Sequence, residues 1–318
     1  MRGGDPIHSS GQPGARHHSP GQRRRTMARG DGVTKRRSIQ GGNRALSCVR
    51  SHRHAGSQSV VGGRGMSNSN PTLRVLSLGA GVQSSALALM AEEGDAPMPD
   101  CAIFADVGAE PREVYDYLEY LESVLSFPVY RVMKGEGLTR GLEKSVSNGE
   151  RVANPPLYTR MDETRNVGGD VIKVGESEGM LRRQCTDEFK IKPITKKTRE
   201  LLGLKPGERV KKGTKVESMQ GISLDEIQRM RESKQDWLSF RYPLIEMRMS
   251  RHDCKRWIEE NQHPQPPRSA CVYCPYRSNH EWRNLRENDP EGWAEAVRVD
   301  AMIRDGMDGT TQKLFVHQ

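Results

Sequence analysis

The sequence has few aromatic residues and no long apolar run. Phe, Trp and Tyr make up 5% of its 318 residues, although 34% of all residues are hydrophobic, which is enough to build a core. No stretch approaches the roughly 18 apolar residues of a membrane-spanning helix, so we expect no membrane partner. No apolar segment typical of a secretory signal follows Met1, and we therefore expect a cytoplasmic protein.

Cysteine is also scarce, with six residues in the whole chain. Small secreted proteins that depend on disulfides are shorter and richer in cysteine, so a disulfide scaffold is not expected. In a reducing compartment, a Cys-x-x-Cys pair such as Cys271 and Cys274 indicates metal binding or redox chemistry instead.

Acidic residues are nearly absent from the first 66 positions. This segment holds 13 of the 50 Lys and Arg residues and 2 of the 41 Asp and Glu residues, which leaves 37 basic and 39 acidic residues elsewhere. The net charge of +9 therefore comes from the N-terminal segment and does not indicate nucleic-acid binding by the rest. Its Gly, Ser, Arg and His content predicts a disordered basic tail, with Met66 as an alternative physiological start.

After residue 72, short apolar runs alternate with helical patterns. Strands are predicted at residues 73–78, 101–105 and 128–132, and helices at 86–93, 111–125 and 193–203. This alternation is typical of an α/β fold with a doubly wound, mostly parallel sheet. Residues 134–180 are rich in Gly, Asn, Asp and Glu with weak periodicity, and we expect a long excursion or lid there.

A glycine-rich loop at residues 79–85 (Gly-Ala-Gly-Val-Gln-Ser-Ser) separates the first predicted strand from the first helix. Glycine lets the backbone approach phosphate oxygens. The first N–H groups of the helix have no partner within the helix, and its dipole favours an anion there. The Walker A and Gly-x-Gly-x-x-Gly patterns are both absent. The loop predicts a phosphate site, and a turn that binds nothing is the alternative.

The loop resembles the pyrophosphate loop (PP-loop), Ser-Gly-Gly-x-Asp-Ser, of the adenine nucleotide alpha hydrolase superfamily. That superfamily includes phosphoadenosine phosphosulfate (PAPS) reductases, ATP sulfurylase-type enzymes and tRNA thiolation enzymes. Gly79 stands at the motif's first Ser, Ala80 and Gly81 at its Gly pair, Gln83 at its Asp and Ser84 at its final Ser. Gln83 is a departure, because a neutral amide cannot help to hold Mg²⁺ as a carboxylate would.

Four later segments resemble the same family in the same order. Residues 104–110 are similar to Phe-x-Asp-Thr-Gly-x-Glu, and residues 185–193 to Cys-x-x-x-x-Lys-x-x-Pro. Residues 221–226 are similar to Gly-Ile-Ser/Arg-x-Asp-Glu, and residues 242–246 to Tyr-x-Pro-Leu. The resemblance implies a disordered basic tail (1–66), a PP-loop nucleotide-binding α/β domain (73–246) and a small Cys-containing helical region (247–318).

The resemblance also implies the residues of the site. Catalytic roles fall on Asp106, Arg183 and Lys190. The residues expected to bind the nucleotide are Ser77, Gly79, Ala80, Gly81, Gln83, Ser84, Ser85, Gly108, Arg182, Gly221 and Asp225. Asp106 would bind ribose hydroxyls or a metal ion, and a simple turn residue is the alternative. Arg182, Arg183 and Lys190 gather positive charge beside Cys185, which suits phosphate or sulfate.

Four cysteines are candidate metal ligands. The thiolates of Cys271 and Cys274 fit one tetrahedral metal ion or one iron–sulfur cluster, and Cys185 and Cys254 are the natural further ligands. We favour a [4Fe–4S] cluster, because relatives in the resembled family carry one. Zn²⁺ and a redox dithiol without metal are the alternatives. Cys101 lies within a predicted strand and is expected in the core.

Two reactions are known on the scaffold that the chain resembles. In an ATP pyrophosphatase, a substrate oxygen attacks the α-phosphate, pyrophosphate leaves, and a sulfur donor can then displace AMP. A PAPS reductase instead releases sulfite, using a cysteine in a C-terminal Glu-Cys-Gly-x-His segment that this chain lacks.

We therefore favour a PAPS reductase-like ATP pyrophosphatase with adenylating or sulfur-transfer chemistry, for which Mg²⁺ is a candidate cofactor. An adenine nucleotide is the expected ligand, and nucleic acid and a sulfur donor protein are candidate partners. The alternatives are a PAPS reductase and, outside enzymes, a zinc-stabilised nucleic-acid-binding module.

Overall fold

Five strands form the central sheet in the computed structural model, which describes residues 71–310 and 312–317. They are β1 (Leu73–Leu78), β2 (Cys101–Asp106), β3 (Val129–Met133), β6 (Val216–Gln220) and β7 (Leu238–Arg241). Their order is β3-β2-β1-β6-β7, and every neighbouring pair is parallel. The three strands predicted from the sequence are confirmed. The predicted disordered tail at residues 1–66 lies outside the described residues.

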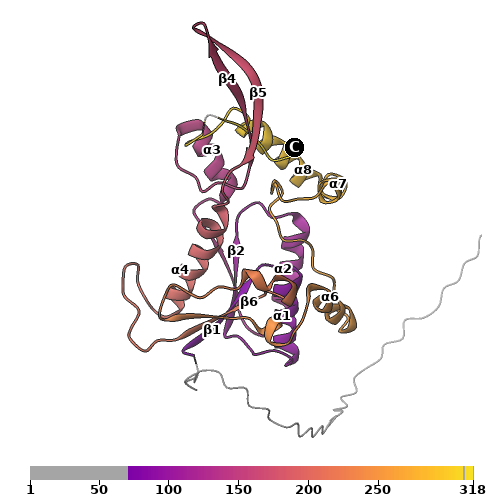
Figure 1. Cartoon of the computed structure of the whole chain (residues 1–318). Coiled ribbons are helices and arrows are strands. Elements are labelled where there is room, and N and C mark those ends of the chain that lie inside the picture. Colours follow the sequence, from indigo (N-terminus) through magenta and orange to yellow (C-terminus); the bar gives the residue numbers. More distant parts are fainter. Residues whose placement is uncertain (1–70, 311, 318) are drawn as a thin grey trace, which may run out of the picture. The chain divides into compact units, whose positions relative to one another are not determined.

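Helices cover both faces of this sheet (Figure 1). Side chains along a strand alternate between its two faces. Leu76 and Leu78 of β1 face a core formed with α1 (Val82–Glu93), α2 (Arg112–Val124) and α6 (Arg251–Glu260). Val75 faces a second, smaller core beneath α4 (Lys192–Leu201). The prediction of a doubly wound, parallel α/β sheet is therefore confirmed.

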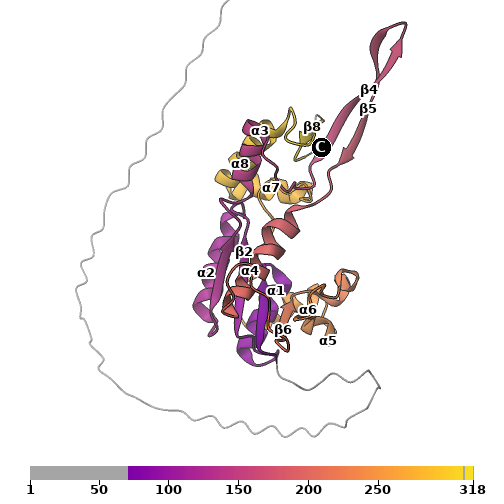
Figure 2. The same cartoon turned by 90° about the vertical axis from the view of Figure 1, so that its left-hand side faces the viewer.

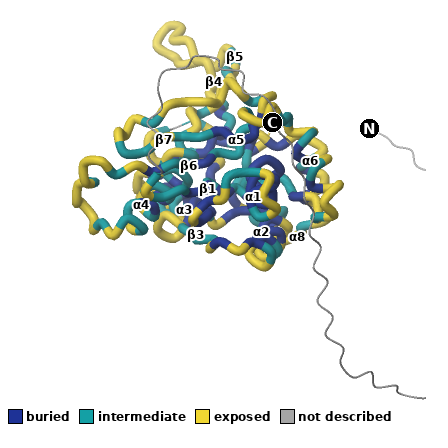
Figure 3. Tube along the Cα trace, turned by 90° about the horizontal axis from the view of Figure 1, so that it is seen from below, coloured by how far each residue is buried: buried dark blue, intermediate teal, exposed yellow. Residues whose placement is uncertain are grey.

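Helix α1 is buried on almost every side. Its residues from Val82 to Ala91 are all buried, because β1 and the other helices of this core enclose it. The helix ends at Gly94, which adopts the left-handed conformation (φ 86°) that glycine accepts readily. A helix held in this way fixes the position of the glycine-rich loop that precedes it. Figure 3 shows buried residues along β1 and α1.

A third core lies beyond the carboxyl end of β2. Val107 and Ala109, just after β2, pack there with α3, α7, α8 and β8. The bounds of these elements are Leu138–Asn148 for α3, Asn279–Asn288 for α7, Pro290–Ile303 for α8 and Lys313–Phe315 for β8. The described residues form one compact unit, and α6 packs against α1 within it. None of the described helices is both long enough and apolar enough to cross a membrane.

The excursion or lid expected at residues 134–180 contains regular secondary structure that the sequence analysis did not predict. This segment contains α3 and a long antiparallel hairpin of β4 (Tyr158–Val167) and β5 (Asp170–Met180), which extends away from the rest of the unit (Figure 2). Both faces of the hairpin are largely exposed, so no alternation of apolar and polar residues marks its strands. Gly168 and Gly169 form the two-residue turn, with φ values of 63° and 101°.

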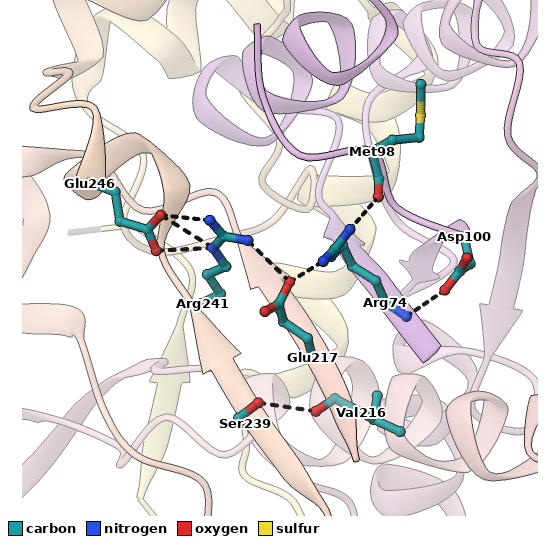
Figure 4. A network of polar contacts seen from close by, with 8 residues as sticks. All are labelled: Arg74, Met98, Asp100, Val216, Glu217, Ser239, Arg241 and Glu246. Atoms are coloured by element: carbon teal, nitrogen blue, oxygen red, sulfur yellow. Dashed lines mark hydrogen bonds and ion pairs between the residues drawn. The ribbon is translucent and has the colours of Figure 1, made fainter. Parts of the chain in front are cut away.

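A polar network crosses the sheet at β1, β6 and β7 (Figure 4). The Arg74 guanidinium donates to the Glu217 carboxylate (2.6 Å), and Arg241 contacts the same carboxylate oxygen (3.5 Å). Arg241 also pairs with Glu246 in the short helix α5 (Pro243–Glu246). The network therefore connects three neighbouring strands with the segment that follows the sheet.

Candidate active site

The glycine-rich loop connects β1 to α1 and is held by its own hydrogen bonds. The Gly79 N–H donates to Ser84 Oγ (3.1 Å), and Ser84 Oγ donates to the Gly81 carbonyl (3.3 Å). The Ser85 N–H donates to the same carbonyl (3.0 Å), which starts the helix. The Ser84 hydroxyl thus fixes the shape of the loop without a ligand.

Ala80 in this loop has the left-handed backbone conformation, with φ at 52°. The resembled motif has glycine at this position, where the conformation carries little penalty. An alanine there is strained by about 1–2 kcal/mol, and its side chain is fully buried (0% exposed). Such strain persists only where surrounding packing determines the backbone, and it is often found at functional sites.

Gly221, which directly follows β6, packs tightly against the start of α1. A Cβ at this position would lie 2.6 Å from Ser84 Cα and 2.7 Å from Ser84 N. Gly81 lies beside the C-terminal segment, where a Cβ would make an ordinary contact, 3.6 Å from Ser269 Cβ. The loop is therefore enclosed between the end of β6 and the segment that leads to Cys271.

A cavity of about 500 Å³ opens beside the loop, within the usual size range of ligand sites. It is lined by six of the predicted site residues: Ser77, Gly79, Ser84, Arg183, Lys190 and Gly221. Gln220, Arg229, Arg231, Phe240 and Tyr242, which the sequence analysis did not single out, also line it. Asp and Glu are absent from its lining among the described residues, so the charged groups at this cavity are all cations.

Two of these cations have no acidic partner among the described residues. The Arg183 guanidinium lies over the Tyr276 ring, and the Arg231 guanidinium lies over the Phe240 ring, each 5.7 Å from the ring centroid. Stacking on an aromatic ring orients a guanidinium and leaves its N–H donors free for an anion.

The other two cations are paired. Arg229 donates to Glu226 (2.7 Å) at the end of the 3₁₀ helix η2 (Leu224–Arg229). Lys190 belongs to a π-helical turn, η1 (Thr186–Ile191), and its ammonium group donates to Glu110 Oε1 (3.1 Å). Burial acts to lower the pKa of Lys190, but the charge of Glu110 and this hydrogen bond outweigh it and raise the pKa.

The remaining predicted nucleotide-binding residues do not line the cavity: Ala80, Gly81, Gln83, Ser85, Gly108, Arg182 and Asp225. The Gln83 amide donates to Ser223 Oγ (3.3 Å) and to Glu226 Oε2 (3.2 Å), and Arg251 donates to its oxygen (3.4 Å). Asp225 Oδ1 accepts from the Arg251 N–H at the start of α6 (2.7 Å). Gln83 and Asp225 thus support the cavity wall by joining α1, η2 and α6.

Asp106 also accepts hydrogen bonds from neighbouring residues of the fold. Its Oδ1 atom accepts from the Gly108 N–H (2.7 Å) and from the Tyr115 hydroxyl (2.9 Å). Burial and the Asp106 charge together raise the pKa of Tyr115, so this hydroxyl remains a donor. The neighbouring Ala105 lines the cavity, whereas Asp106 holds the turn after β2. A catalytic role for Asp106 stays a prediction.

The Cys-x-x-Cys segment forms a turn beside Glu110. The Cys274 N–H donates to the Cys271 carbonyl (3.0 Å), and the Val272 N–H donates to the Ala109 carbonyl (2.7 Å). The thiols of Cys271, Cys274 and Cys185 are all free and partly exposed. That these three cysteines belong to one ligand set stays a prediction.

Cys254 lies elsewhere, in the core between α1 and α6, and is fully buried (0% exposed). It shares the apolar face of α6 with Ile258, four residues later, which explains its burial. Burial raises its pKa to about 12, with Asp225 and Asp253 as its acidic neighbours. The expectation that Cys254 completes a four-cysteine ligand set is not supported by this placement.

No group of three or more His, Cys, Asp or Glu side chains in the described part of the chain is arranged to hold a metal ion. The donors present therefore do not fit the expected [4Fe–4S] cluster, nor the zinc of the nucleic-acid-binding alternative. Mg²⁺ prefers carboxylate oxygens as protein ligands, and none of the described residues that line the cavity supplies one.

Comparison with known proteins gives a distant structural likeness. No protein-family model matches the sequence, and no curated protein matches it significantly. Among solved structures, the chain is similar to phosphoadenylyl-sulfate (PAPS) reductase from Candida auris in its phosphate complex, with 12% identity and a TM-score of 0.36. The match covers 61% of this chain and 75% of that one. The function proposed below therefore rests on the residues that line the cavity.

Proposed function

We propose that this chain is a PAPS reductase-like enzyme that binds the phosphates of an adenine nucleotide in the cavity beside the glycine-rich loop. The observation that carries the proposal is the lining of this cavity, which combines loop residues Gly79 and Ser84 with four cationic side chains. Two of them, Arg183 and Arg231, have no acidic partner among the described residues. Backbone N–H groups and arginine are the donors that phosphate recognition uses most.

The nucleoside would bind in a second cavity next to the phosphate site. A second cavity of about 290 Å³ shares Ser77, Gln220, Arg231 and Phe240 with the first and continues along α4. Its apolar wall comes from Ile191, Ile194, Leu238 and Phe240, which suit the faces of a purine and its ribose. We therefore assign the phosphates to the loop and the nucleoside to the second cavity.

The favoured reaction is attack on the α-phosphate with release of pyrophosphate. Charge that develops on the phosphate oxygens would be stabilised by donors held in place before the reaction, which are the loop amides, Arg183 and Lys190. A sulfur donor would then displace AMP from the adenylated substrate, which forms the new C–S bond as the bond to AMP breaks. A nucleic-acid substrate and a sulfur donor protein stay predictions from the sequence, since no feature of the described residues indicates either.

The second candidate is reduction of PAPS. The position of Arg229 and Arg231 favours it, because they enter the cavity from the η2–β7 segment, whereas Arg183 comes from the segment before η1. A nucleotide with a phosphate at each end would use both groups of cations. ATP carries its phosphates at one end only. Arg231 would therefore contact a phosphate of PAPS but not one of ATP.

Isothermal titration with ATP and with PAPS tests the proposal. Arg183→Ala removes charge-assisted hydrogen bonds that are each worth about 1.5–3 kcal/mol, so we expect a roughly 10- to 100-fold loss of affinity for the true ligand. Arg182→Ala is the matched control, because Arg182 is exposed and does not line the cavity. Pyrophosphate or sulfite release then identifies the reaction. Equal affinities of wild type and Arg183→Ala would contradict the proposed site.

A further inference from the structure

Lys190 reaches the cavity with a single hydrogen-bond partner. It lines the cavity beside the glycine-rich loop, and its side chain is 34% exposed. The ammonium group carries three N–H donors, and among the described residues only Glu110 Oε1 accepts from it (3.1 Å). Two donors are therefore left for a ligand. Because the stem of a lysine is long and flexible, Glu110 is the group that fixes this ammonium in one position.

The backbone around Lys190 is held by its neighbours. Phe189 is buried in the core beyond the carboxyl end of β2. Glu188 pairs with both Lys134 and Lys192. These contacts hold the π-helical turn η1, and turns of this kind are frequent at functional sites. The backbone of Lys190 is therefore in place before a ligand binds, and only the end of its side chain depends on Glu110.

Glu110 is fixed on both sides of its own backbone. It stands directly before Pro111, the N-cap of α2, whose ring restricts the chain. Its N–H donates to the Tyr115 hydroxyl (3.4 Å), and the preceding Ala109 carbonyl accepts from the Val272 N–H (2.7 Å). The Glu110 side chain is completely buried (0% exposed). The carboxylate therefore has a defined place, from which it sets the position of the ammonium group.

Packing gives no reason for a carboxylate at position 110. The Oε2 atom of Glu110 is buried without a hydrogen-bond partner among the described residues. A buried oxygen of this kind is unfavourable, and an apolar pair of similar size is often at least as stable as a buried ion pair. Glu110 does not line the cavity, so a ligand there would contact Lys190 and not the carboxylate. What the carboxylate contributes is therefore the charge and position of Lys190.

We propose that Glu110 is a positioning residue, which holds the Lys190 ammonium group at the place where charge develops on the reacting phosphate. This inference rests on the proposed function, in which Lys190 acts on a phosphate bound in the cavity. Charge that is held in place before the reaction serves the transition state more than the bound substrate. Without the Glu110 carboxylate, the ammonium group would still pair with a bound phosphate, but in the position that the substrate favours. The loss should therefore appear in the rate.

Turnover by the full chain tests this role. Glu110→Gln keeps the size of the side chain and removes its charge. We expect kcat for release of pyrophosphate from ATP, or of sulfite from PAPS, to fall about 10- to 100-fold, while KM changes less than about threefold. A residue that only stabilised the fold would lower the melting temperature without this division between kcat and KM. Should Glu110→Gln not fold, Glu110→Asp retracts the charge by one methylene and is expected to lower kcat in the same way.

Lys190→Met shows whether Glu110 acts through Lys190. Alone, it is expected to lower kcat at least as much as Glu110→Gln does. Adding Glu110→Gln to Lys190→Met should then lower kcat by less than about twofold more, since the group that Glu110 positions is already absent. A double variant in which the two losses multiply overturns the proposal, and so does an unchanged kcat in Glu110→Gln.

Amine labelling tests the contact without a nucleotide. The full chain and its Glu110→Gln variant are treated briefly with acetic anhydride, and acetylation of each lysine is measured by mass spectrometry. A lysine held by a carboxylate reacts slowly, so we expect Lys190 to be acetylated about tenfold faster in Glu110→Gln. Lys192 is the internal control, because its partner Glu188 is unchanged.

The labelling separates this inference from the proposed function. Equal acetylation of Lys190 in the wild type and in Glu110→Gln overturns the positioning role, whatever nucleotide the chain binds. A wild type that binds neither ATP nor PAPS overturns the proposed function instead, and the labelling rates then still decide whether Glu110 holds Lys190.

Discussion

At the scale of single residues, the site depends on positions where side-chain size or backbone conformation is tightly constrained. Ala80 keeps a left-handed conformation in a loop whose neighbours are fixed by Ser84. Glu110 keeps one oxygen unpartnered in a fully buried setting. Residues of this kind reveal function because packing alone gives no reason to keep them.

Ala80→Gly tests how much strain the loop stores. The change relieves about 1–2 kcal/mol of left-handed strain, but it loses about 0.8 kcal/mol of methyl burial and raises the entropy of the unfolded chain. We expect the free energy of unfolding to change by less than about 1 kcal/mol. Ala86→Gly in α1 is the control and should cost about 2 kcal/mol, because Ala86 is equally buried in ordinary helical backbone. Equal losses in urea unfolding would disprove the strain at Ala80.

At the scale of secondary-structure elements, the cavity depends on how the ends of strands meet the start of α1. Gly221 brings the end of β6 into contact with Ser84, and the network of Glu217 connects β6 to both neighbouring strands. Each contact joins elements that are far apart in sequence. Changes at these contacts should therefore alter stability and ligand affinity together.

Gly221→Ala should force the end of β6 away from the glycine-rich loop. Its Cβ would meet backbone atoms of Ser84, which cannot move aside as a flexible side chain can. We expect a loss of about 1–3 kcal/mol in stability, together with weaker nucleotide binding. Gly175→Ala is the control, since its Cβ would meet only the flexible Glu163 side chain. Calorimetric melting temperatures compare the two variants, and similar values would argue against the close approach.

Glu217→Gln should weaken the network across β1, β6 and β7. The carboxylate is only 20% exposed and contacts both Arg74 and Arg241, so an amide would leave Arg74 without its charge partner and Arg241 with Glu246 alone. We expect a loss of about 1 kcal/mol in the free energy of unfolding. Glu176→Gln in the exposed hairpin removes a comparable ion pair and should cause no measurable loss. If both variants unfold at the same urea concentration, the network adds nothing to stability.

The sequence predicted the elements that carry a strong apolar pattern and missed those that do not. The strands around Leu76 and Ile103 are short and mostly apolar runs, and the helix after the glycine-rich loop is rich in Ala and Leu. The β4–β5 hairpin was missed because both of its faces are largely exposed, although its Gly-Gly turn was a usable signal. Burial of a whole helix face and exposure of a hairpin follow from tertiary packing, which local pattern does not encode.

The candidate site was predicted in part for the same reason. Gly79, Ser84 and Arg183 line the cavity as expected, since the motifs that contain them are continuous in sequence. Arg231 was missed because its place over Phe240 depends on the pairing of β6 with β7. The spacing of Arg229 and Arg231 directly after the Gly-Ile-Ser segment was the one available sign.

At the scale of the whole molecule, every described residue of the cavity and of the Glu110–Lys190 pair belongs to the unit of residues 66–318. We expect deletion of residues 1–65 to leave nucleotide affinity unchanged, and to remove any binding of nucleic acid that the basic segment provides. Titrations of the full chain and the shortened chain with the same nucleotide and a short DNA duplex measure both effects. A shortened chain that folds but no longer binds the nucleotide would place part of the site in the N-terminal segment.

Arg183 belongs to two environments at once. It lines the cavity beside the glycine-rich loop, and its guanidinium lies over the ring of Tyr276, two residues after Cys274. An anion bound in the cavity and the Tyr276 ring would therefore share one guanidinium. Because thermodynamic coupling is reciprocal, a change that fixes Tyr276 in place should alter the affinity for the anion, and a bound anion should alter the stability of the Tyr276 turn by the same free energy.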